Sequence, residues 1–464
     1  MLTEARKQFI ELLGAENYLE SMEDRTTYAY DATGEKCLPE AVVFPRNVEQ
    51  VSQILAIANT GNIPVVPRGA GSGLTGGAVP LAGGIVMVMM NHFNRILTID
   101  TDNLQAIVEP GVITAKLHAA VEAQGLFYPP DPASMTVCSI GGNIAENAGG
   151  MRAVKYGVTK DFVMGLEVVL PSGEVIHTGS RCIKDVVGYD LTRLFVGSEG
   201  TLGVITKAVL KLLPLPEAKH TLTATFDSMG GAARTIAEIR KKGIIPTTLE
   251  FMDKRCIGAV ETYLKMGLPV EAEAMLLIEV DGKASELEND LQRVRRVCKA
   301  NRAIAVRVAK EKESQEKLWH SRRSIHSALI NLRPKWEEED ISVPVARIPD
   351  MVAILEKIGQ KYDVLVASFG HAGDGNIHVA IAAEDRDTPH EKILQARTEV
   401  LRKAVAMDGR IAAEHGIGFI KRDKIGWNID ASTLALMQSI KRLIDPNGIL
   451  NPGKIFPSSI ACSR

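Results

Sequence analysis

Residues 68–77 read RGAGSGLTGG, and five of these ten residues are glycine. A short apolar segment with two prolines, predicted as a strand, precedes this loop at 63–67, and the sequence AVPLAGG at 78–84 does not favour the start of a helix. Glycines leave backbone N–H groups uncovered, and such groups bind phosphate. The spacing Gly71-x-Gly73-x-x-Gly76 matches the dinucleotide fingerprint, but that fingerprint requires a helix after the loop. The sequence therefore favours a pyrophosphate loop of another type over a nicotinamide Rossmann fold, with a purely structural glycine loop as the alternative.

Further clusters of small residues follow at 129–134, 138–143, 147–150 and 197–206. Around them the sequence predicts helices at 47–59 and 113–124, strands at 84–90 and 105–108, and a hairpin of 162–170 with 174–178. The stretch from 129 to 150 is predicted as irregular. So many glycines in one region indicate backbone held close to a flat or charged ligand. One large cofactor is therefore favoured over several unrelated loops.

The sequence changes in texture near residue 216, where we expect a domain boundary. Beyond it, strands are predicted at 220–226, 247–251, 274–280, 303–308, 364–368 and 377–381, and helices at 231–241, 286–299, 312–332 and 393–407. Split β-α-β units of this kind favour a ferredoxin-like sheet with helices on one face. We detect no internal sequence repeat.

Two histidines bracket a turn in HAGDGNIH, residues 371–378. Asp-Gly between apolar segments is typical of a two-residue hairpin turn. If Asp374 and Gly375 are the turn, His371 pairs directly with His378, with Cβ atoms roughly 5 Å apart. One metal ion could then bind both rings, with Glu414 as a candidate third ligand. The alternative is a hairpin with two histidines that bind only protein groups.

Composition excludes several classes of protein. The chain has 464 residues and a net charge of −2, so no basic excess points to nucleic acid or an anionic membrane. The longest apolar run, near 81–90, is too short to span a bilayer, and residues 1–13 form an amphipathic pattern unlike a signal peptide. The six scattered cysteines argue against a disulfide framework or an iron–sulfur cluster, and a reducing cytoplasm fits.

The motifs taken together resemble one flavoprotein family. They are residues 67–77, SIGGN at 139–143, GSEGTLG at 197–203, the histidine hairpin, EHGIG at 414–418 and DPNGILNPGK at 445–454. In this order they resemble the FAD-dependent D-2-hydroxyacid dehydrogenases of the vanillyl-alcohol-oxidase superfamily, the group of glycolate oxidase D subunits, D-lactate dehydrogenases and D-2-hydroxyglutarate dehydrogenases. The resemblance implies an α+β fold: a two-part FAD-binding domain of the PCMH type (1–216), a substrate or cap domain with an antiparallel sheet (217–410), and a C-terminal, helical segment that packs back on the FAD domain (411–464).

The resemblance also implies a substrate site. His371, His378 and Glu414 resemble the metal ligands, and His415 resembles the base beside the substrate hydroxyl. Arg322 resembles the arginine that binds the substrate carboxylate, and His326 is implied as a further substrate-binding residue. The metal would be divalent, with zinc favoured and iron(II) or manganese as alternatives.

The FAD-binding residues implied by the resemblance come from every small-residue cluster. They are Pro67, Arg68, Gly69, Ala70, Gly71, Ser72, Gly73, Thr75, Gly76, Pro130, Asp131, Ser134, Ser139, Gly141, Gly142, Asn143, Asn147, Gly149, Gly150, Glu199, Gly200, Gly203, Val204, Ile205 and Asn451. Some members of the superfamily attach FAD to a histidine near the first loop. Ser72 stands there instead, so non-covalent FAD is expected.

Two departures from the hydroxyglutarate enzymes bear on the substrate. An acidic run, 337–340, stands where those enzymes have a lysine, and Ala380 stands where they have an asparagine. A small D-2-hydroxy acid such as glycolate or D-lactate is therefore favoured, oxidised to the 2-oxo acid. The alternatives are a D-2-hydroxyglutarate dehydrogenase, another alcohol oxidase on this scaffold, or an electron-relay subunit without catalysis.

The chain has no iron–sulfur motif. The expected acceptor is an iron–sulfur subunit, an electron-transferring flavoprotein or a quinone. Any membrane attachment is expected to come through that partner, and a homodimer is an assembly that the resemblance allows.

Overall fold

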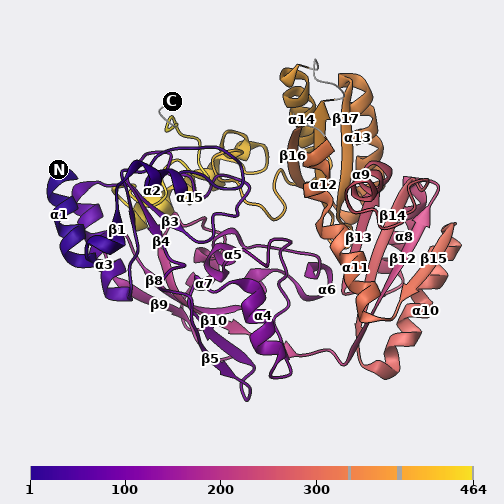
Figure 1. Ribbon diagram of the computed structural model, residues 1–464, viewed down its shortest axis with the longest axis horizontal. Helices are drawn as coiled ribbons and strands as arrows, with labels where there is room; N and C mark the ends of the chain where they lie inside the picture. The colour runs from indigo at the N-terminus through magenta and orange to yellow at the C-terminus, as the bar shows by residue number, and fades with distance from the viewer. Residues whose placement is uncertain (1, 333–335, 384–388, 462–464) are drawn as a thin grey trace. The chain divides into compact units, whose positions relative to one another are not determined.

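The computed structural model describes residues 2–332, 336–383 and 389–461. The chain divides into two compact units. The first contains Met1–Gly149, Val158–Leu215 and Glu414–Arg464, and the second contains Gly150–Gly157 and Pro216–Ala413 (Figure 1). Residues Gly150–Gly157 thus belong to the second unit, although the sequence placed all of residues 1–216 in one domain.

The first unit begins with a four-stranded sheet in the order β1-β2-β4-β3. Its strands are β1 (Tyr18–Leu19), β2 (Ala41–Val43), β4 (Ile85–Val88) and β3 (Val65–Arg68), and β4 pairs in parallel with both β2 and β3. Helices α1 (Leu2–Leu13) and α3 (Val48–Gly61) pack their apolar residues with this sheet in one core. The same core includes Ile449 and Leu450, so the C-terminal segment returns to the first sheet.

The second sheet of this unit has five antiparallel strands in the order β5-β6-β10-β8-β9. They are β5 (Ile96–Asp100), β6 (Gln105–Val108), β10 (Val204–Lys211), β8 (Val163–Val169) and β9 (Val175–Gly179). The predicted hairpin is confirmed as the pair of β8 and β9, and the predicted helix near 113–124 is confirmed as α4 (Thr114–Glu122).

The prediction of an irregular stretch from 129 to 150 is wrong in its second half. Residues Ile140–Glu146 form helix α5, which Ser139 caps through a hydrogen bond from the Gly142 N–H. Asn147, in the left-handed conformation, ends it. The two glycines in its first turn have low helix propensity and favoured an irregular prediction, although Ser139 is of a residue type that commonly begins helices.

The second unit is built on a seven-stranded antiparallel sheet, in the order β15-β12-β14-β13-β17-β18-β16 (Figure 1). Its first four strands in chain order are β12 (Ala218–Phe226), β13 (Thr248–Asp253), β14 (Ala274–Gly282) and β15 (Ala305–Ala309). Helices α8 (Met229–Lys241) and α10 (Ala284–Ala300) connect β12 to β13 and β14 to β15. The ferredoxin-like prediction is confirmed for this part, because the strands lie in the order fourth, first, third, second.

The remaining strands repeat this topology. Strand β16 (Trp336–Ser342), helix α13 (Ile348–Tyr362), strands β17 (Val364–His371) and β18 (Asn376–Ala383) and helix α14 (His390–Val405) follow in the same succession. A single bridge between Ser342 and Arg410 stands where the fourth strand would be. The two halves join through the second strand of each, β13 and β17, over three residue pairs. The fold therefore contains a duplication that the sequence analysis did not detect.

Two further predictions for this unit are wrong. Helices pack on both faces of the sheet: α8, α10, α13 and α14 form one layer, and α9 (Lys254–Leu264) and α12 (Ile325–Leu332) pack on Phe369 and Ala380 of the other face. The single helix predicted at 312–332 is divided at Ser324 into α11 (Lys312–Arg323) and α12. Strand β16 and helices α9 and α13 were not predicted.

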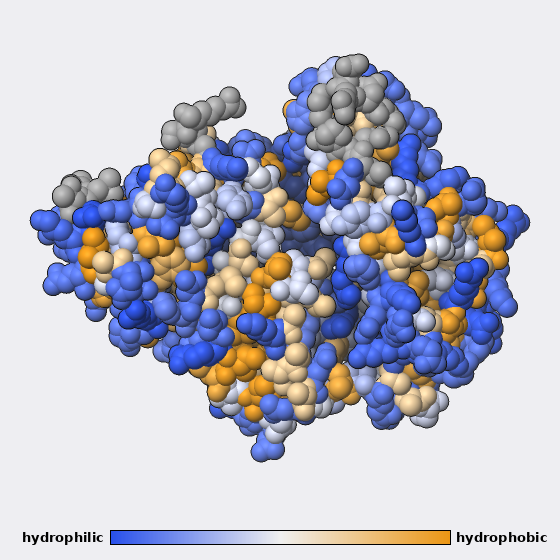
Figure 2. Space-filling view, in the orientation of Figure 1, coloured by the Kyte–Doolittle hydropathy of each residue, from blue (hydrophilic) through white to orange (hydrophobic). Residues whose placement is uncertain are grey.

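Cys37 is disulfide-bonded, which the scattered cysteine spacing did not indicate, whereas Cys138, Cys182, Cys256 and Cys298 carry free thiols. Among the described residues, no helix is long and apolar enough to cross a membrane. Hydrophilic residues cover most of the face of the second unit that is in view in Figure 2.

Candidate functional site

The glycine-rich loop of the first unit presents a run of unpaired backbone donors. No backbone N–H from Gly69 to Gly77 donates to a protein acceptor among the described residues, although most of this loop is half-buried. A Cβ atom on Gly76 would overlap the Phe419 ring. Sheltered N–H groups without protein partners fit a pyrophosphate, because its oxygens can accept several hydrogen bonds at once.

The loop is held by its neighbours within the first unit. Arg68, at the start of the loop, is buried and donates from Nη1 to the Tyr30 carbonyl oxygen at 2.8 Å. This hydrogen bond fixes the start of the loop to the segment around Tyr30. Burial lowers its pKa, which the charge of Asp31 opposes. Asn451 donates from Nδ2 to the carbonyl oxygens of Gly77 at 2.9 Å and Glu199 at 2.8 Å. These contacts join the first loop, the 197–203 cluster and the C-terminal segment.

The other clusters converge on the same region. A Cβ on Gly69 would overlap Ser139 Oγ, and one on Gly200 would lie 3.5 Å from Pro67 Cγ. Asn143 is buried and donates to Thr114 Oγ1 at 2.7 Å, so its amide holds α5 in place. The remaining predicted cofactor residues fall into four places: Pro130, Asp131 and Ser134 precede α5; Gly141 and Gly142 lie in its first turn; Asn147, Gly149 and Gly150 follow it; Gly203 precedes β10, and Val204 and Ile205 are the first two residues of that strand. Gly150 alone of these belongs to the second unit.

A group of charges with buried polar atoms lies beside the loop; Glu199 is among the predicted cofactor residues, whereas Glu146 and Lys454 were not predicted. Glu146 Oε2 is buried without a hydrogen-bond partner, and burial together with the negative charge of Glu199 raises its pKa well above the usual value. Glu199 accepts from the N–H groups of Ile417 and Gly418, both at 2.8 Å, while burial raises its pKa. Burial lowers the pKa of the nearby Lys454 to about 7. Nothing in the sequence alone indicates that the side chains of Glu146 and Lys454 are buried charges.

The histidine hairpin of the second unit differs from its predicted register. Phe369, not His371, lies opposite His378, so the predicted direct pair is wrong. Gly370 has a φ of 157°, and His371 instead pairs with Glu250 of β13. The two imidazole rings still meet, with centroids 5.4 Å apart at an interplanar angle of 87°. The two imidazoles are therefore adjacent, as a shared metal ion would require, although the strand register differs from the predicted one.

Glu250 links His371 to Arg322. Its buried carboxylate accepts from His371 Nδ1 at 2.8 Å and from Arg322 Nε at 2.8 Å, and Arg322 Nη2 lies 2.6 Å from the same carboxylate. Burial acts to raise the pKa of Glu250, but the positive charges of His371 and Arg322 outweigh it and hold the pKa below its usual value. The guanidinium also lies over the Phe369 ring, 5.0 Å from its centroid.

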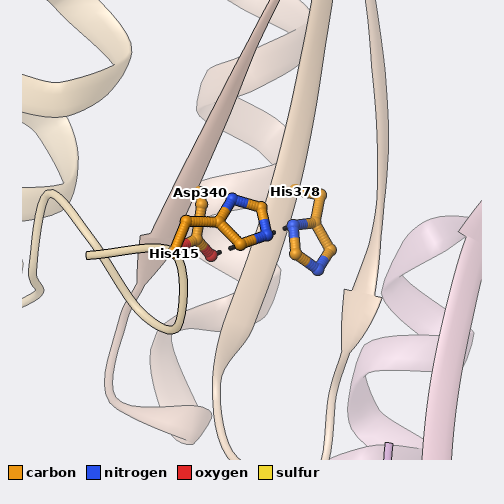
Figure 3. Close-up of side chains that lie close together, drawn as sticks. All are labelled: Asp340, His378 and His415. Carbon is orange, nitrogen blue, oxygen red and sulfur yellow. Dashed lines mark ion pairs between the residues drawn. The ribbon is translucent and has the colours of Figure 1, made fainter. Parts of the chain in front are cut away.

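The acidic run lies on β16, and its side chains alternate between the two faces of the sheet. Asp340 is directly opposite His378, and its Oδ1 lies 3.8 Å from His378 Nδ1; both side chains are labelled in Figure 3. Glu338 accepts from His326 Nδ1 at 2.7 Å on the same face. Burial acts to lower the pKa of His326, but this hydrogen bond and the negative charge of Glu338 together outweigh burial and raise the pKa. Glu337 and Glu339 pair with Arg397 of α14 on the other face.

Glu414 and His415 open the segment that returns to the first unit. Ala413, directly before them, donates its N–H to Asp340 at 2.9 Å within the second unit. In the first unit, Thr75 Oγ1 donates to the His415 carbonyl oxygen at 3.0 Å. A Cβ on Gly149 would lie 2.7 Å from Glu414 Oε2. Any larger residue at position 149 would therefore require the Glu414 side chain to move.

Comparison with known proteins gives matches over nearly the whole chain. The model of the C-terminal domain of FAD linked oxidases matches residues 215–455, and an FAD binding domain model matches residues 39–179. The glycolate oxidase subunit GlcD of Bacillus subtilis is 46% identical over 455 residues, covering 98% of this chain and 97% of that protein. A D-lactate dehydrogenase of Anaerostipes hadrus is 37% identical and covers 90% of each chain.

Among solved structures, p-cresol methylhydroxylase with bound substrate superposes with a TM-score of 0.79 at 20% identity, over 98% of this chain and 96% of that one. This likeness concerns the fold alone, and it agrees with the α+β architecture of the PCMH type. The matches to the two family models and to the relatives agree with the motif order in the sequence. The chain therefore belongs to the FAD-linked oxidases, as an oxidoreductase of the D-2-hydroxyacid dehydrogenase group within the vanillyl-alcohol-oxidase superfamily.

Proposed function

We propose that this protein oxidises a small D-2-hydroxy acid, glycolate or D-lactate, to the corresponding 2-oxo acid. The observation that carries the proposal is the grouping of His371, His378 and Arg322 on one face of the second unit's sheet. Two imidazoles suit a divalent metal, and a guanidinium suits a carboxylate. A 2-hydroxy acid needs both, one for its hydroxyl and one for its carboxylate.

FAD fits the first unit, where sheltered N–H groups and close glycines form a cradle. When bound, it accepts the hydride from C2 of the substrate, and that chemistry belongs to the cofactor. Residues 69–77 would hold the pyrophosphate, and Asn451 keeps that loop in place through Gly77. With Ser72 where some relatives have a histidine, FAD is held without a covalent bond.

The metal ligands proposed are His371, His378 and Glu414, and the metal is divalent, with zinc favoured. A divalent metal lowers the pKa of a hydroxyl bound to it. His415 is the proposed base that takes the hydroxyl proton, since an imidazole can do so near neutral pH. Arg322 binds the substrate carboxylate. Glu250 occupies the side of the guanidinium that carries Nε and Nη2. The two terminal nitrogens, Nη1 and Nη2, therefore form the side available to the substrate carboxylate.

Charge on β16 supports a monocarboxylic substrate. Glu338 and Asp340 both lie on the face that carries His378, and Glu338 accepts from His326, a proposed substrate-binding residue. A second substrate carboxylate would meet these negative groups, whereas glycolate and D-lactate have none to place there. Ala380, opposite Glu338, offers no polar group.

Electrons leave the flavin for a partner, for which an iron–sulfur subunit or an electron-transferring flavoprotein is favoured over a free quinone. A surface loop supports a protein partner. Ile183, Val186, Val187 and Tyr189 are each about 90% exposed, at 89%, 93%, 92% and 95%. Large apolar side chains grouped in this way are typical of protein interfaces.

The test is anaerobic bleaching of the flavin absorbance of the purified protein. Glycolate, D-lactate, L-lactate and D-2-hydroxyglutarate are added separately, with and without prior chelation. Rapid bleaching by glycolate or D-lactate that chelation abolishes is the expected result. A higher kcat/KM for D-2-hydroxyglutarate than for D-lactate would overturn the substrate assignment. Bleaching by none of them would favour the electron-relay alternative.

A further inference from the structure

We propose that Glu250 is the positioning residue of the substrate site: it fixes which nitrogen His371 offers to the metal and which edge Arg322 offers to the substrate. The inference rests on the proposed function and adds a residue that neither the motifs nor the resemblance assigned. Glu250 is fully buried at the centre of the sheet, on the strand where the two halves of the duplication join.

The histidine contact determines the tautomer. Glu250 and His371 are directly opposed on β13 and β17, and directly opposed residues point to the same face of a sheet. An ionised carboxylate only accepts hydrogen bonds, so His371 Nδ1 must carry the proton in the 2.8 Å contact. In the neutral imidazole, which is the form that binds a metal, the lone pair of His371 is then on Nε2. A histidine that ligates a metal commonly donates its other N–H to a carboxylate in this way.

The arginine contact determines the orientation of the guanidinium. Nε and Nη2 of Arg322 face the Glu250 carboxylate, and Phe369 lies beneath the guanidinium plane. These two contacts leave little freedom to rotate about the last bonds of the side chain. One carboxylate thus sets both groups, so its loss would change metal binding and substrate binding together.

Glu279 provides a matched control on the neighbouring strand. It is also buried, it lies on the same face because it is two residues from Leu277, the partner of Glu250, and it accepts hydrogen bonds from Thr221 and Trp319. Its partners include no metal-binding or substrate-binding candidate. Glu279→Gln therefore reports the general cost of removing a buried carboxylate from this sheet.

The experiment compares wild-type, Glu250→Gln and Glu279→Gln holoproteins by competition for Zn²⁺ with a chromogenic chelator, without substrate. Glu250→Gln is expected to weaken Zn²⁺ binding by about 10- to 100-fold, and Glu279→Gln by less than about threefold. In flavin bleaching, Glu250→Gln should raise the KM for D-lactate and lower kcat. Glu250→Asp, which keeps the charge on a shorter side chain, should also lose at least about tenfold in Zn²⁺ affinity, and it serves if Glu250→Gln does not fold.

Two outcomes separate this inference from the proposed function. Zn²⁺ binding by Glu250→Gln within about threefold of wild type, or an equal loss in Glu279→Gln, overturns the role of Glu250 alone. If the wild-type protein itself binds no divalent metal, the metal-assisted function fails, and this inference fails with it.

Discussion

Lys454 is a buried cation in the first unit, and its ammonium donates to the carbonyl oxygen of Val79. Burial lowers its pKa to about 7, although Asp31 and Glu199 oppose this. An unfolded lysine titrates at about 10.4, so between pH 7 and 10 the folded chain binds fewer protons at this site than the unfolded chain. Stability from this group therefore increases with pH in that window. The free energy of unfolding of wild type minus that of Lys454→Met should rise by about 2 kcal/mol from pH 7 to 9.

Urea unfolding at a series of pH values measures this difference. Lys441→Met is the control, since the Lys441 side chain is only partly buried and forms an ion pair with Asp445, which opposes the lowering of its pKa by burial. A difference between wild type and Lys454→Met that stays flat from pH 7 to 9 would show that Lys454 remains charged throughout.

At the residue scale, the sequence was informative where a residue type is tied to a motif. His371 and His378 could be named in this way, Arg322 followed only from the family resemblance, and the structure brings the three side chains together beside one sheet face. Glu250 could not, because nothing in a single sequence says that a glutamate in a strand faces inward toward two cations. One signal was present: Glu250 is the only charged residue of the predicted strand 247–251, although β13 itself extends to Asp253. A charge in such a place must be paired if it is buried.

The turn between β17 and β18 depends on Gly375 at the element scale. Gly375 has a φ of 93°, and a Cβ there would overlap the carbonyl oxygen of Val343. Gly267 has a φ of 75° but has no atom within 4 Å of the Cβ position. Gly375→Ala is expected to reduce the free energy of unfolding by at least about 1 kcal/mol more than Gly267→Ala, because both substitutions strain φ but only the first also meets backbone.

Denaturant unfolding followed by circular dichroism compares the two variants with wild type. Equal losses for Gly375→Ala and Gly267→Ala would mean that the hairpin accommodates the methyl group by a shift of the 343–345 segment.

Helices and strands were predictable where apolar residues have a clear period, as for β12, α8 and α10. The errors share a cause: local patterns do not carry tertiary pairing. The Asp-Gly pattern predicted a two-residue turn with His371 opposite His378. In the structure His371 pairs with Glu250 of β13, and Phe369 is the residue opposite His378. The acidic run 337–340 was not predicted as a strand, yet in β16 its side chains face His326 and His378 on one side and Arg397 on the other.

For the whole molecule, fold class and cofactor could be inferred from motif order, because each glycine cluster has a fixed place in the first unit. The duplication in the second unit could not, since the two halves share topology without a visible sequence repeat. Its consequence is functional: the junction of β13 and β17 places Glu250 of one half against His371 of the other.

Most of the proposed ligands of the two bound groups lie in different units, although the third proposed metal ligand, Glu414, belongs to the first unit. All the proposed FAD-binding residues except Gly150 belong to the first unit, whereas His371 and His378 belong to the second. Removal of the metal should therefore leave FAD in place. After dialysis against a chelator, the ratio of flavin to protein should stay within about 10% of its starting value while the metal content falls. Loss of flavin in proportion to metal would show instead that the metal ligands help to hold the cofactor.

The flavin itself is expected to be bound without a covalent link, because Ser72 offers none. Acid precipitation should therefore release the flavin into the supernatant, and colour in the acid pellet would contradict non-covalent binding.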